Sequence, residues 1–305
     1  MGVSEYHRHR RSEILRHHPE VRALMGPRPA TVVSTAGVLA VQFAIAALLG
    51  GRPWWWALLA AVFVGAFLAH YLNVVIHEAT HNLIFRKTAA NKAASIFANL
   101  ASVIPSAIGF RHYHRLHHAS LGQHGVDADV APEWESALIG RGRLGKLFWL
   151  FIQPITYAAL HPALVARRLP IDVWFLANVV LVLGATAAMG WAFGAPAVIY
   201  LLASTYLSVG PHPTGAHILQ EHINFEGQYV TASYDGPINA LSMNFGLHVE
   251  HHDLPSIPGP RLRALHQLAP TYYADGFRHR SRWSVLWRFV TDPQVGLDTR
   301  MIHPR

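Results

Sequence analysis

The chain has no cysteine among its 305 residues. This absence excludes disulfide bonds, iron–sulfur clusters and a thiolate-ligated haem within the chain. Redox chemistry in this protein would therefore need another kind of metal or cofactor site. Its electrons would have to come from a separate donor.

Charged residues are also scarce, at 14% of the chain, and three long stretches contain none: 29–51, 53–77 and 173–220. A helix needs about 20 apolar residues to cross the hydrocarbon core of a bilayer. The charge-free stretches are long enough to meet this requirement four times. The predicted spans are 31–50, 54–76, 173–191 and 196–212.

Two further apolar segments, 93–110 and 147–166, are less regular, and the second contains Pro154, His161 and Pro162. We expect both to be interfacial or re-entrant segments. Lys and Arg cluster before the first span and again between the second and third spans, which predicts that both termini are cytoplasmic. The predicted fold class is an all-α integral membrane protein, with about four transmembrane helices and a cytoplasmic histidine-rich di-metal cap.

The sequence shows no internal repeat or linker, so we expect a single membrane domain over 1–305. Its expected parts are a cytoplasmic segment at 1–30, spans over 31–212 with a cytoplasmic insertion at about 77–170, and a cytoplasmic cap at 213–305. The net charge of +8 suits contact with anionic lipid headgroups. Nucleic-acid binding, the competing interpretation of a basic chain, does not fit one with four spans.

Histidine is abundant, with 22 residues, and three short motifs space it as a helix face would. These histidine boxes are His77–Glu78–Ala79–Thr80–His81, His114–Arg115–Leu116–His117–His118 and His248–Val249–Glu250–His251–His252. Positions i, i+3 and i+4 share one helix face, and each box follows or precedes a predicted span on the cytoplasmic side. A lone histidine is usually structural, but three boxes with such spacing predict one metal site.

Eight histidines are too many for one zinc ion, which takes three or four protein ligands in tetrahedral geometry. The boxes therefore predict two metals that accept imidazole at higher coordination, and iron fits best. The first box also matches H-E-x-x-H, the zinc metalloprotease motif in which the glutamate is a general base. An intramembrane protease is a distant alternative, since it would leave the histidines of the other two boxes unused. We instead expect Glu78 to orient a neighbouring imidazole or polar group.

These boxes resemble those of the membrane fatty-acid desaturase and hydroxylase superfamily. The segment from Asn244 to Gly259 is similar to the third box of one of its families, the sphingolipid Δ4-desaturases or dihydroceramide desaturases. The resemblance extends over nearly the whole chain. It includes 10–15, 18–21, Gly122 to Asp129, Tyr272–Tyr273, and Trp283 to Asp292.

The resemblance implies a ninth histidine ligand between the second and third boxes, which we match to His222. The implied metal ligands are His77, His81, His114, His117, His118, His222, His248, His251 and His252. His112 and His217 are candidates for supporting or headgroup contacts, or are simply structural. Asp127 and Asp129 either accept the free N–H of ligating histidines or are solvated loop acids.

The resemblance implies desaturation of a lipid chain with O2 as co-substrate, since no side chain can oxidise an unactivated methylene. We expect a trans Δ4 double bond in the sphingoid chain of dihydroceramide. A sphingolipid C4-hydroxylase or a fatty-acyl desaturase remains open as an alternative. Electrons would come from cytochrome b5 or a ferredoxin, with a reductase. A metal transporter would need polar residues along its spans, and these are few.

Overall fold

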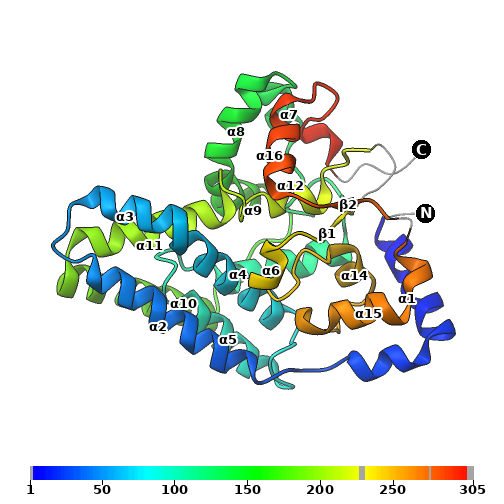
Figure 1. Ribbon diagram of the computed structural model, residues 1–305, viewed down its shortest axis with the longest axis horizontal. Coiled ribbons are helices and arrows are strands. Elements are labelled where there is room, and N and C mark those ends of the chain that lie inside the picture. The colour runs from blue at the N-terminus through cyan, green and yellow to red at the C-terminus, as the bar shows by residue number, and fades with distance from the viewer. Residues whose placement is uncertain (1–2, 227–230, 275, 301–305) are drawn as a thin grey trace. The chain divides into compact units, whose positions relative to one another are not determined.

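The computed structural model describes residues 3–226, 231–274 and 276–300, and most of these are helical (Figure 1). The chain forms two compact units. The apolar unit comprises Pro27–His112 and Leu169–Gly215, and the histidine-rich unit comprises Met1–Gly26, Tyr113–Arg168 and Ala216–Arg305. The predicted dominance of helix is confirmed. The predicted division at residues 30 and 212 stays a prediction.

The apolar unit is built from long apolar helices. These are α2 (Thr31–Leu48), α3 (Trp54–Ala60), α4 (Ala66–Thr80), α5 (Thr88–Asn99), the start of α6 (Ala107–Ala119), α10 (Val173–Phe193) and α11 (Ala195–Val209). A π-helical turn at Ala61–Gly65 joins α3 to α4 into one helix of 27 residues. α11 packs against α2, α3 and α4, and α10 packs against α5 and α11 (Figure 1).

Polar side chains join the helices inside this unit. The Tyr200 hydroxyl donates to Gln42 at 2.9 Å, and the Asn73 amide donates to Ser208 at 2.9 Å. Asn99, at the end of α5, accepts from Asn178 on α10 at 2.8 Å and from the backbone N–H of Ser106 at 2.9 Å. Buried polar groups with partners fix one packing arrangement because leaving either partner unpaired is costly.

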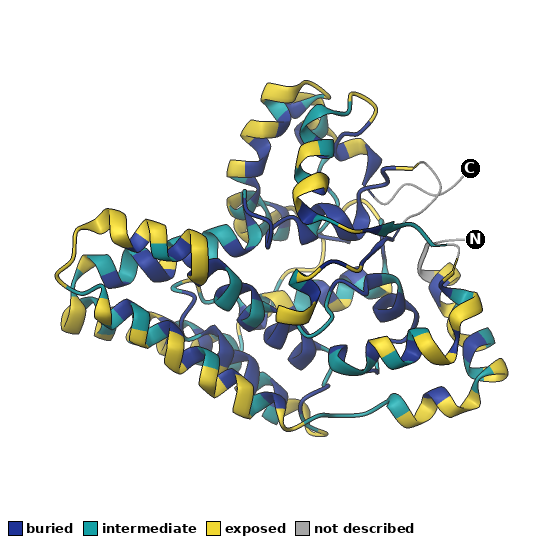
Figure 2. Ribbon diagram, in the orientation of Figure 1, coloured by how far each residue is buried: buried dark blue, intermediate teal, exposed yellow. Residues whose placement is uncertain are grey.

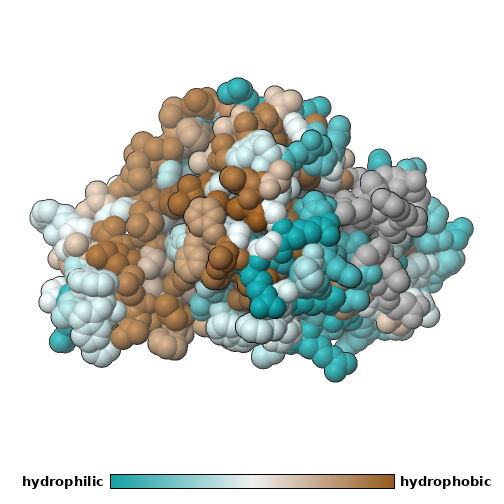
Figure 3. All heavy atoms as spheres, turned by 90° about the horizontal axis from the view of Figure 1, so that it is seen from above, coloured by the Kyte–Doolittle hydropathy of each residue, from teal (hydrophilic) through white to brown (hydrophobic). Residues whose placement is uncertain are grey.

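The outer faces of these helices suit a lipid environment. Only 11% of the apolar stretch of α10 is buried, and Figure 2 shows exposed residues along α2 and α10. Phe63, Val180 and Trp191 are among the large hydrophobic side chains that are exposed. The face drawn in Figure 3 carries a broad area of hydrophobic side chains. Surface of this composition would be unfavourable in water but is favourable against lipid tails.

Within the part of the chain that the structure describes, four helices are long and apolar enough to cross a membrane, as the sequence predicted, but the set differs from the predicted one. They are Thr31–Leu48, Trp54–Thr80, Val173–Phe193 and Arg143–Leu164. The predicted span at 196–212 is the shorter helix α11, whose 15 residues extend about 22 Å at 1.5 Å per residue. The segment 93–110 is broken between α5 and α6, so it is not one span.

The helix Arg143–Leu164 belongs to the histidine-rich unit and has two unlike faces. It comprises α8 (Arg143–Ile155), a π-helical turn at Thr156–Leu160 and α9 (His161–Leu164). Phe148 and Phe151 are exposed, whereas Trp149 is buried and its indole N–H donates to Glu135 at 2.9 Å. One apolar and one protein-facing side is typical of a helix lying in the membrane interface. The interfacial assignment of 147–166 stays a prediction.

The rest of the histidine-rich unit consists of short elements around two hydrophobic cores. They are α1 (Val3–His17), α7 (Glu133–Ile139), α12 (His217–His222), α13 (Ile238–Leu241), α14 (His248–Asp253), α15 (Leu262–Leu268) and α16 (Arg282–Thr291). Strands β1 (Ser233–Tyr234) and β2 (Arg278–His279) form a parallel pair. One core includes Trp149 and Phe289, and the other includes Ile14 and Leu265.

Gly65 lies at a close approach of the α3–α4 helix to α11. A Cβ at this position would lie 2.0 Å from Ser204 Oγ and 2.8 Å from a Tyr200 ring carbon. We expect Gly65→Ala to lower the free energy of unfolding by about 1–3 kcal/mol, because the packed core cannot accommodate the methyl group. Thermal unfolding of the detergent-solubilised protein measures this change.

Gly37→Ala on α2 is the matched control, because a Cβ at Gly37 would meet nothing within 4 Å. Alanine is the better helix former, so this variant should gain roughly 0.5–1 kcal/mol. The close approach of the helices at Gly65 would be contradicted if both substitutions stabilised the protein equally.

Candidate metal centre

The second histidine box lies on the last turns of α6 and points three imidazoles to one side. The Nε2 atoms of His114 and His118 are 3.1 Å apart, and His251 on α14 places its Nε2 3.1 Å from that of His118. The ligand atoms of these three residues all lie within 4.8 Å of one another. We call His114, His118 and His251 cluster A.

A second group forms beside it from α6, α12 and α14. The Nε2 of His222, at the end of α12, is 3.1 Å from the Nε2 atoms of both His117 and His248. The Nε2 of His252 is 3.1 Å from that of His248. We call His117, His222, His248 and His252 cluster B. The rings of His118 and His252 stack at 4.3 Å, so the two clusters adjoin.

The spacing of these nitrogens fits a shared metal better than hydrogen bonds between rings. A neutral imidazole has one N–H, so it cannot donate from Nε2 when Nδ1 carries the proton. Nitrogens bound to one ion at about 2.0–2.1 Å would be about 2.8–3.0 Å apart at right angles and roughly 3.3–3.4 Å apart in a tetrahedron. The observed 3.1 Å lies between these values, as expected for nitrogens that share one ion.

The protonation state of His251 and His252 also suits metal binding. Burial, with the positive charge of nearby histidines, lowers the pKa of His251 to about 3 and the pKa of His252 well below its usual value. Both rings are therefore neutral near pH 7. Neutral imidazole is the form that binds a metal ion.

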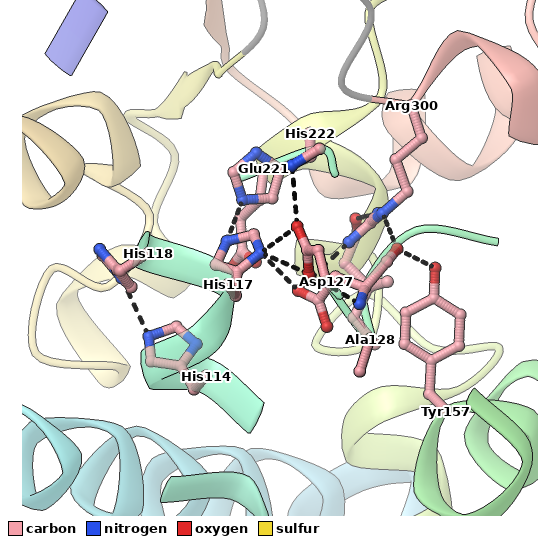
Figure 4. A network of polar contacts seen from close by, with 12 residues as sticks. His114, His117, His118, Asp127, Ala128, Tyr157, Glu221, His222 and Arg300 are labelled. Atoms are coloured by element: carbon pink, nitrogen blue, oxygen red, sulfur yellow. Dashed lines mark hydrogen bonds and ion pairs between the residues drawn. The ribbon is translucent and has the colours of Figure 1, made fainter. Parts of the chain in front are cut away.

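Asp127 lies directly behind His117 (Figure 4). His117 Nδ1 is 3.1 Å from both carboxylate oxygens, and the backbone N–H groups of Gly122 and Asp129 each donate to Asp127 at 2.9 Å. Although burial opposes the charge, the His117 partner and these hydrogen bonds lower the pKa of Asp127 overall. An ionised carboxylate at Nδ1 selects the tautomer whose Nε2 lone pair faces cluster B.

The loop that carries Asp127 is held from the far side by Arg300. Arg300 Nε donates to the Asp129 carbonyl at 2.7 Å, and its Nη1 donates to the Ile218 carbonyl at 2.5 Å. The Tyr157 hydroxyl donates to the same Asp129 carbonyl at 3.1 Å (Figure 4). The Asp129 carboxylate is half-exposed and 3.5 Å from His117 Nδ1. Asp129 therefore lies at the rim of this network, and Asp127 lies inside it.

Helix α14, which carries the third box, is fixed on two sides by its acidic residues. Asp253 lies 2.7 Å from His7 Nδ1, and both of its oxygens accept from Arg10 Nε, at 3.0 and 3.1 Å. Glu250 accepts from Ser233 at 2.6 Å and from Arg278 at 2.9 Å. The contacts of Asp253 therefore hold α14 against α1, and the contacts of Glu250 hold it against β1 and β2.

The first box lies in the apolar unit. His77 is in the last turn of α4 and His81 follows its end, with ring centroids 4.9 Å apart. Buried Arg111 donates to the carbonyls of Ala79 and Thr80 at 2.7 and 3.0 Å. A cation at a helix C-terminus satisfies its open carbonyls and complements the helix dipole. Glu78 is buried beside His77, with 3.9 Å between His77 Nδ1 and the Glu78 carboxylate.

A cavity of about 170 Å³ reaches two of the clustered histidines from the surface of the histidine-rich unit. His118 and His252 lie on its wall, and Arg8 and Arg11 of α1 line it as well. Both arginines are exposed. The clusters are thus reached through an opening with a positively charged edge.

Seven of the nine predicted ligands therefore meet in the histidine-rich unit: His114, His117, His118, His222, His248, His251 and His252. His217 is buried with its ring 5.5 Å from that of Phe245, and His112 is a partly buried residue of α6. Arg111, Glu221 and Asp253 were not predicted from the sequence. Each of these residues is adjacent to, or three residues before, a predicted ligand, and that proximity was the available signal.

Comparisons with known proteins agree with this site. A family model described as fatty acid desaturase matches residues 53–283, a range that contains all three boxes. A model described as sphingolipid Delta4-desaturase matches residues 3–30. A protein of Oryza sativa subsp. japonica, named sphingolipid delta(4)-desaturase DES1-like, is 37% identical over 98% of this chain and 90% of its own length.

Two animal proteins match equally broadly. Sphingolipid delta(4)-desaturase DES1 of Rattus norvegicus is 35% identical over 98% of this chain and 92% of its own length. Sphingolipid delta(4)-desaturase/C4-monooxygenase DES2 of Homo sapiens is 37% identical over 95% of this chain and 90% of its own length.

The apolar helices, the histidine clusters and the family match define an oxidoreductase of the membrane fatty acid desaturase class. Within that class, the chain belongs to the sphingolipid Δ4-desaturase family. The predicted family is confirmed, together with a membrane location and a lipid substrate. The H-E-x-x-H motif lies inside the desaturase match, so the protease alternative loses its basis.

Asp127→Asn tests whether the carboxylate behind His117 supports metal binding. The amide keeps the size of the side chain but cannot hold the charge that favours an N–H on His117 Nδ1. We expect metal affinity to fall about 10–100-fold, as for other carboxylates that orient ligating histidines. Titration of the purified apoprotein with Fe²⁺ or Co²⁺ gives the affinity.

Asp129→Asn is the matched control, since its carboxylate is half-exposed at the rim. It should bind metal within about threefold of the unmodified protein, because partly exposed ion pairs contribute little. Equal losses in the two variants would contradict a specific role for Asp127.

Proposed function

We propose that this chain is an O2-dependent di-iron desaturase that introduces a trans Δ4 double bond into the sphingoid chain of dihydroceramide. The observation that carries the proposal is the match, over nearly the whole chain, to proteins named sphingolipid delta(4)-desaturase. Two adjoining clusters of imidazole nitrogens support the requirement for two metal ions.

The proposed iron ligands are the seven histidines of clusters A and B together with the first box. In this proposal His77 and His81 are ligands as well, and His222 is the ninth ligand. Imidazole suits iron among several metals, and the donor set of neutral nitrogens fits this choice. Glu78 and Asp127 are proposed to orient ligands, and His112 and His217 are proposed to support them. Asp129 is proposed to be a partly solvated loop acid at the rim of the site.

The irons, when bound, would activate O2 for removal of hydrogen from an unactivated methylene, which no side chain can do. The protein's own groups hold the site in place and exclude water. Asp127 fixes the tautomer of His117, and Glu250 and Asp253 fix α14. Burial keeps His251 and His252 neutral, and it holds most of the clustered imidazoles out of water.

Hydroxylation at C4 is the near alternative, because the human relative's name includes C4-monooxygenase. Loss of a second hydrogen gives the double bond, whereas transfer of oxygen to the carbon gives the alcohol. Both products would form at the same metal site of the protein and on the same sphingoid chain. A fatty-acyl substrate is the more distant possibility, and the lipid experiment below distinguishes all three.

We further propose that both termini and the metal site face the cytoplasm. Six arginines lie between residue 8 and residue 28, ahead of the first apolar helix. Arg86, Lys87 and Lys92 follow the end of the α3–α4 helix. An excess of Lys and Arg next to spans is typical of the cytoplasmic side.

Lipid analysis of cells that make dihydroceramide tests the reaction. Expression of the chain with a reductase system should yield a ceramide lighter by two hydrogens, and His251→Ala should abolish this product because it removes a ligand from cluster A. Mass spectrometry measures both. His124→Ala is the matched control, since His124 is an exposed loop residue and its loss should leave the product unchanged.

A product heavier by one oxygen, lost in His251→Ala, would replace the desaturase proposal with the hydroxylase. If the sphingolipids were unchanged and the fatty acyl chains were altered, the substrate would be a fatty acyl chain instead of dihydroceramide. A His251→Ala variant with full activity would contradict the metal site itself.

We propose that the electrons enter from an acidic protein carrier, cytochrome b5 or a ferredoxin with its reductase, at the cavity edged by Arg8 and Arg11. Three features support this. The chain has no cysteine for a cluster or thiolate of its own. The cavity reaches His118 and His252. Complementary charge speeds the docking of an acidic partner.

Reversal of the charge at the cavity edge tests the entry point. Arg8→Glu with Arg11→Glu should slow reduction by a reduced carrier roughly tenfold at low salt, since steering by charge contributes at least this much to association. Stopped-flow absorbance of the carrier measures the rate. Reduction by dithionite should not change.

Arg16→Glu is the matched control, because this arginine is on α1 and exposed but does not line the cavity. It should slow reduction by less than about threefold. If Arg16→Glu had as large an effect as the double reversal, the carrier would recognise only overall charge. An effect on dithionite reduction would indicate damage to the site instead.

A further inference from the structure

Glu221 is a buried acid next to a proposed ligand, and no role has been assigned to it so far. It precedes His222 on α12, and its backbone carbonyl accepts from Ala232 N–H at 3.1 Å. Only 8% of the residue is exposed. The short helix and this hydrogen bond to the segment leading into β1 fix the direction of the side chain, which Figure 4 shows close to His222 and His117.

The carboxylate of Glu221 faces cluster B. Its Oε2 lies 3.8 Å from His248 Nε2, and the ligand atoms of Glu221, His222 and His248 all lie within 4.8 Å of one another. A separation of 3.8 Å is too long for a hydrogen bond. Two ligands of one ion at about 2.0–2.1 Å are roughly 3.0 Å apart at a right angle and about 4.2 Å apart when opposite, and 3.8 Å falls between these limits.

The other oxygen of the same carboxylate is unsatisfied. Glu221 Oε1 is buried and accepts no hydrogen bond from the part of the chain that the structure describes. Leaving a buried carboxylate oxygen without a partner is costly. A bound cation would remove this cost.

The nearby arginines do not donate a hydrogen bond to Glu221 Oε1. Arg300 directs Nε and Nη1 to the carbonyls of Asp129 and Ile218. The guanidinium carbon of Arg282 lies 4.9 Å from the centre of the Tyr234 ring. Both arginines contribute favourable charge at Glu221, but the structure records no hydrogen bond from them to Oε1.

We propose that Glu221 is an oxygen ligand of the metal ion held by cluster B. This inference rests on the proposed di-iron function and adds a carboxylate to its all-histidine ligand set. The two metal positions then differ in charge and in donor type: cluster A offers nitrogen alone, and cluster B offers nitrogen with one anionic oxygen. Mixed imidazole and carboxylate donors are a common environment for iron.

The test is metal binding by the purified apoprotein, followed without turnover. Unmodified protein should bind two equivalents of Co²⁺. Glu221→Gln keeps the shape of the side chain but is a poor ligand, so one equivalent should bind as before and the other about 10–100-fold more weakly, a loss of the size seen when a metal site is perturbed. Infrared difference spectra on metal addition should lose one metal-bound carboxylate band in this variant.

Glu226→Gln is the matched control, because Glu226 lies on the same segment but is exposed and pairs with Arg288. It should retain both equivalents and the carboxylate band. Glu221→Asp keeps the carboxylate and should keep the band. Two full-affinity equivalents and an unchanged spectrum in Glu221→Gln would overturn the proposal.

If Glu221→Gln does not fold, the infrared spectrum and the metal content of the unmodified protein provide an independent test. Absence of any metal-bound carboxylate band on loading the unmodified protein would overturn the role of Glu221. Binding of two equivalents with no such band would leave the di-iron function standing. Binding of no metal at all would overturn the proposed function itself, so the two failures are distinguishable.

Discussion

The structure depends on one constraint: imidazole lone pairs must converge in a buried space without collapsing onto one another. Each ring must be held from behind. Asp127 holds His117, and Asp253 and Glu250 hold the helix that carries the third box. Arg111 closes the end of α4, which carries the first box. These long-range polar contacts all act on elements that carry the clustered histidines. The folding of the histidine-rich unit and the positioning of its imidazoles therefore depend on the same contacts.

The helices of the apolar unit need another source of stability, because in lipid there is little hydrophobic driving force for helices to associate. Its helices are joined by amide and hydroxyl pairs, such as Asn99 with Asn178, and by the close approach at Gly65. These contacts position α4 and the start of α6, from which the first two boxes extend. A rigid apolar scaffold is a prerequisite for ligands that must stay within a few tenths of an ångström.

The histidine ligands could be predicted from sequence because their spacing is local: residues three and four apart share a helix face in any helix. Asp127 could be proposed because it follows the second box closely. Glu221 and Arg111 could not, because their roles depend on contacts made only after folding. The number of long apolar helices was predicted correctly, but α11 is shorter than expected and the 143–164 helix is longer. Hydropathy alone does not reveal where a helix ends or which face it buries.

The contact between α1 and α14 has a consequence for biosynthesis. His7 and Asp253 are 246 residues apart in the chain, so the N-terminal helix leaves the ribosome long before its partner exists. At about 5–20 residues per second, the wait is roughly 12–50 seconds. During that interval Arg10 lacks Asp253, the carboxylate that it contacts in the folded protein. Closure of α1 onto α14 must therefore be a late event, and the histidines of α14 stay uncovered by α1 until then.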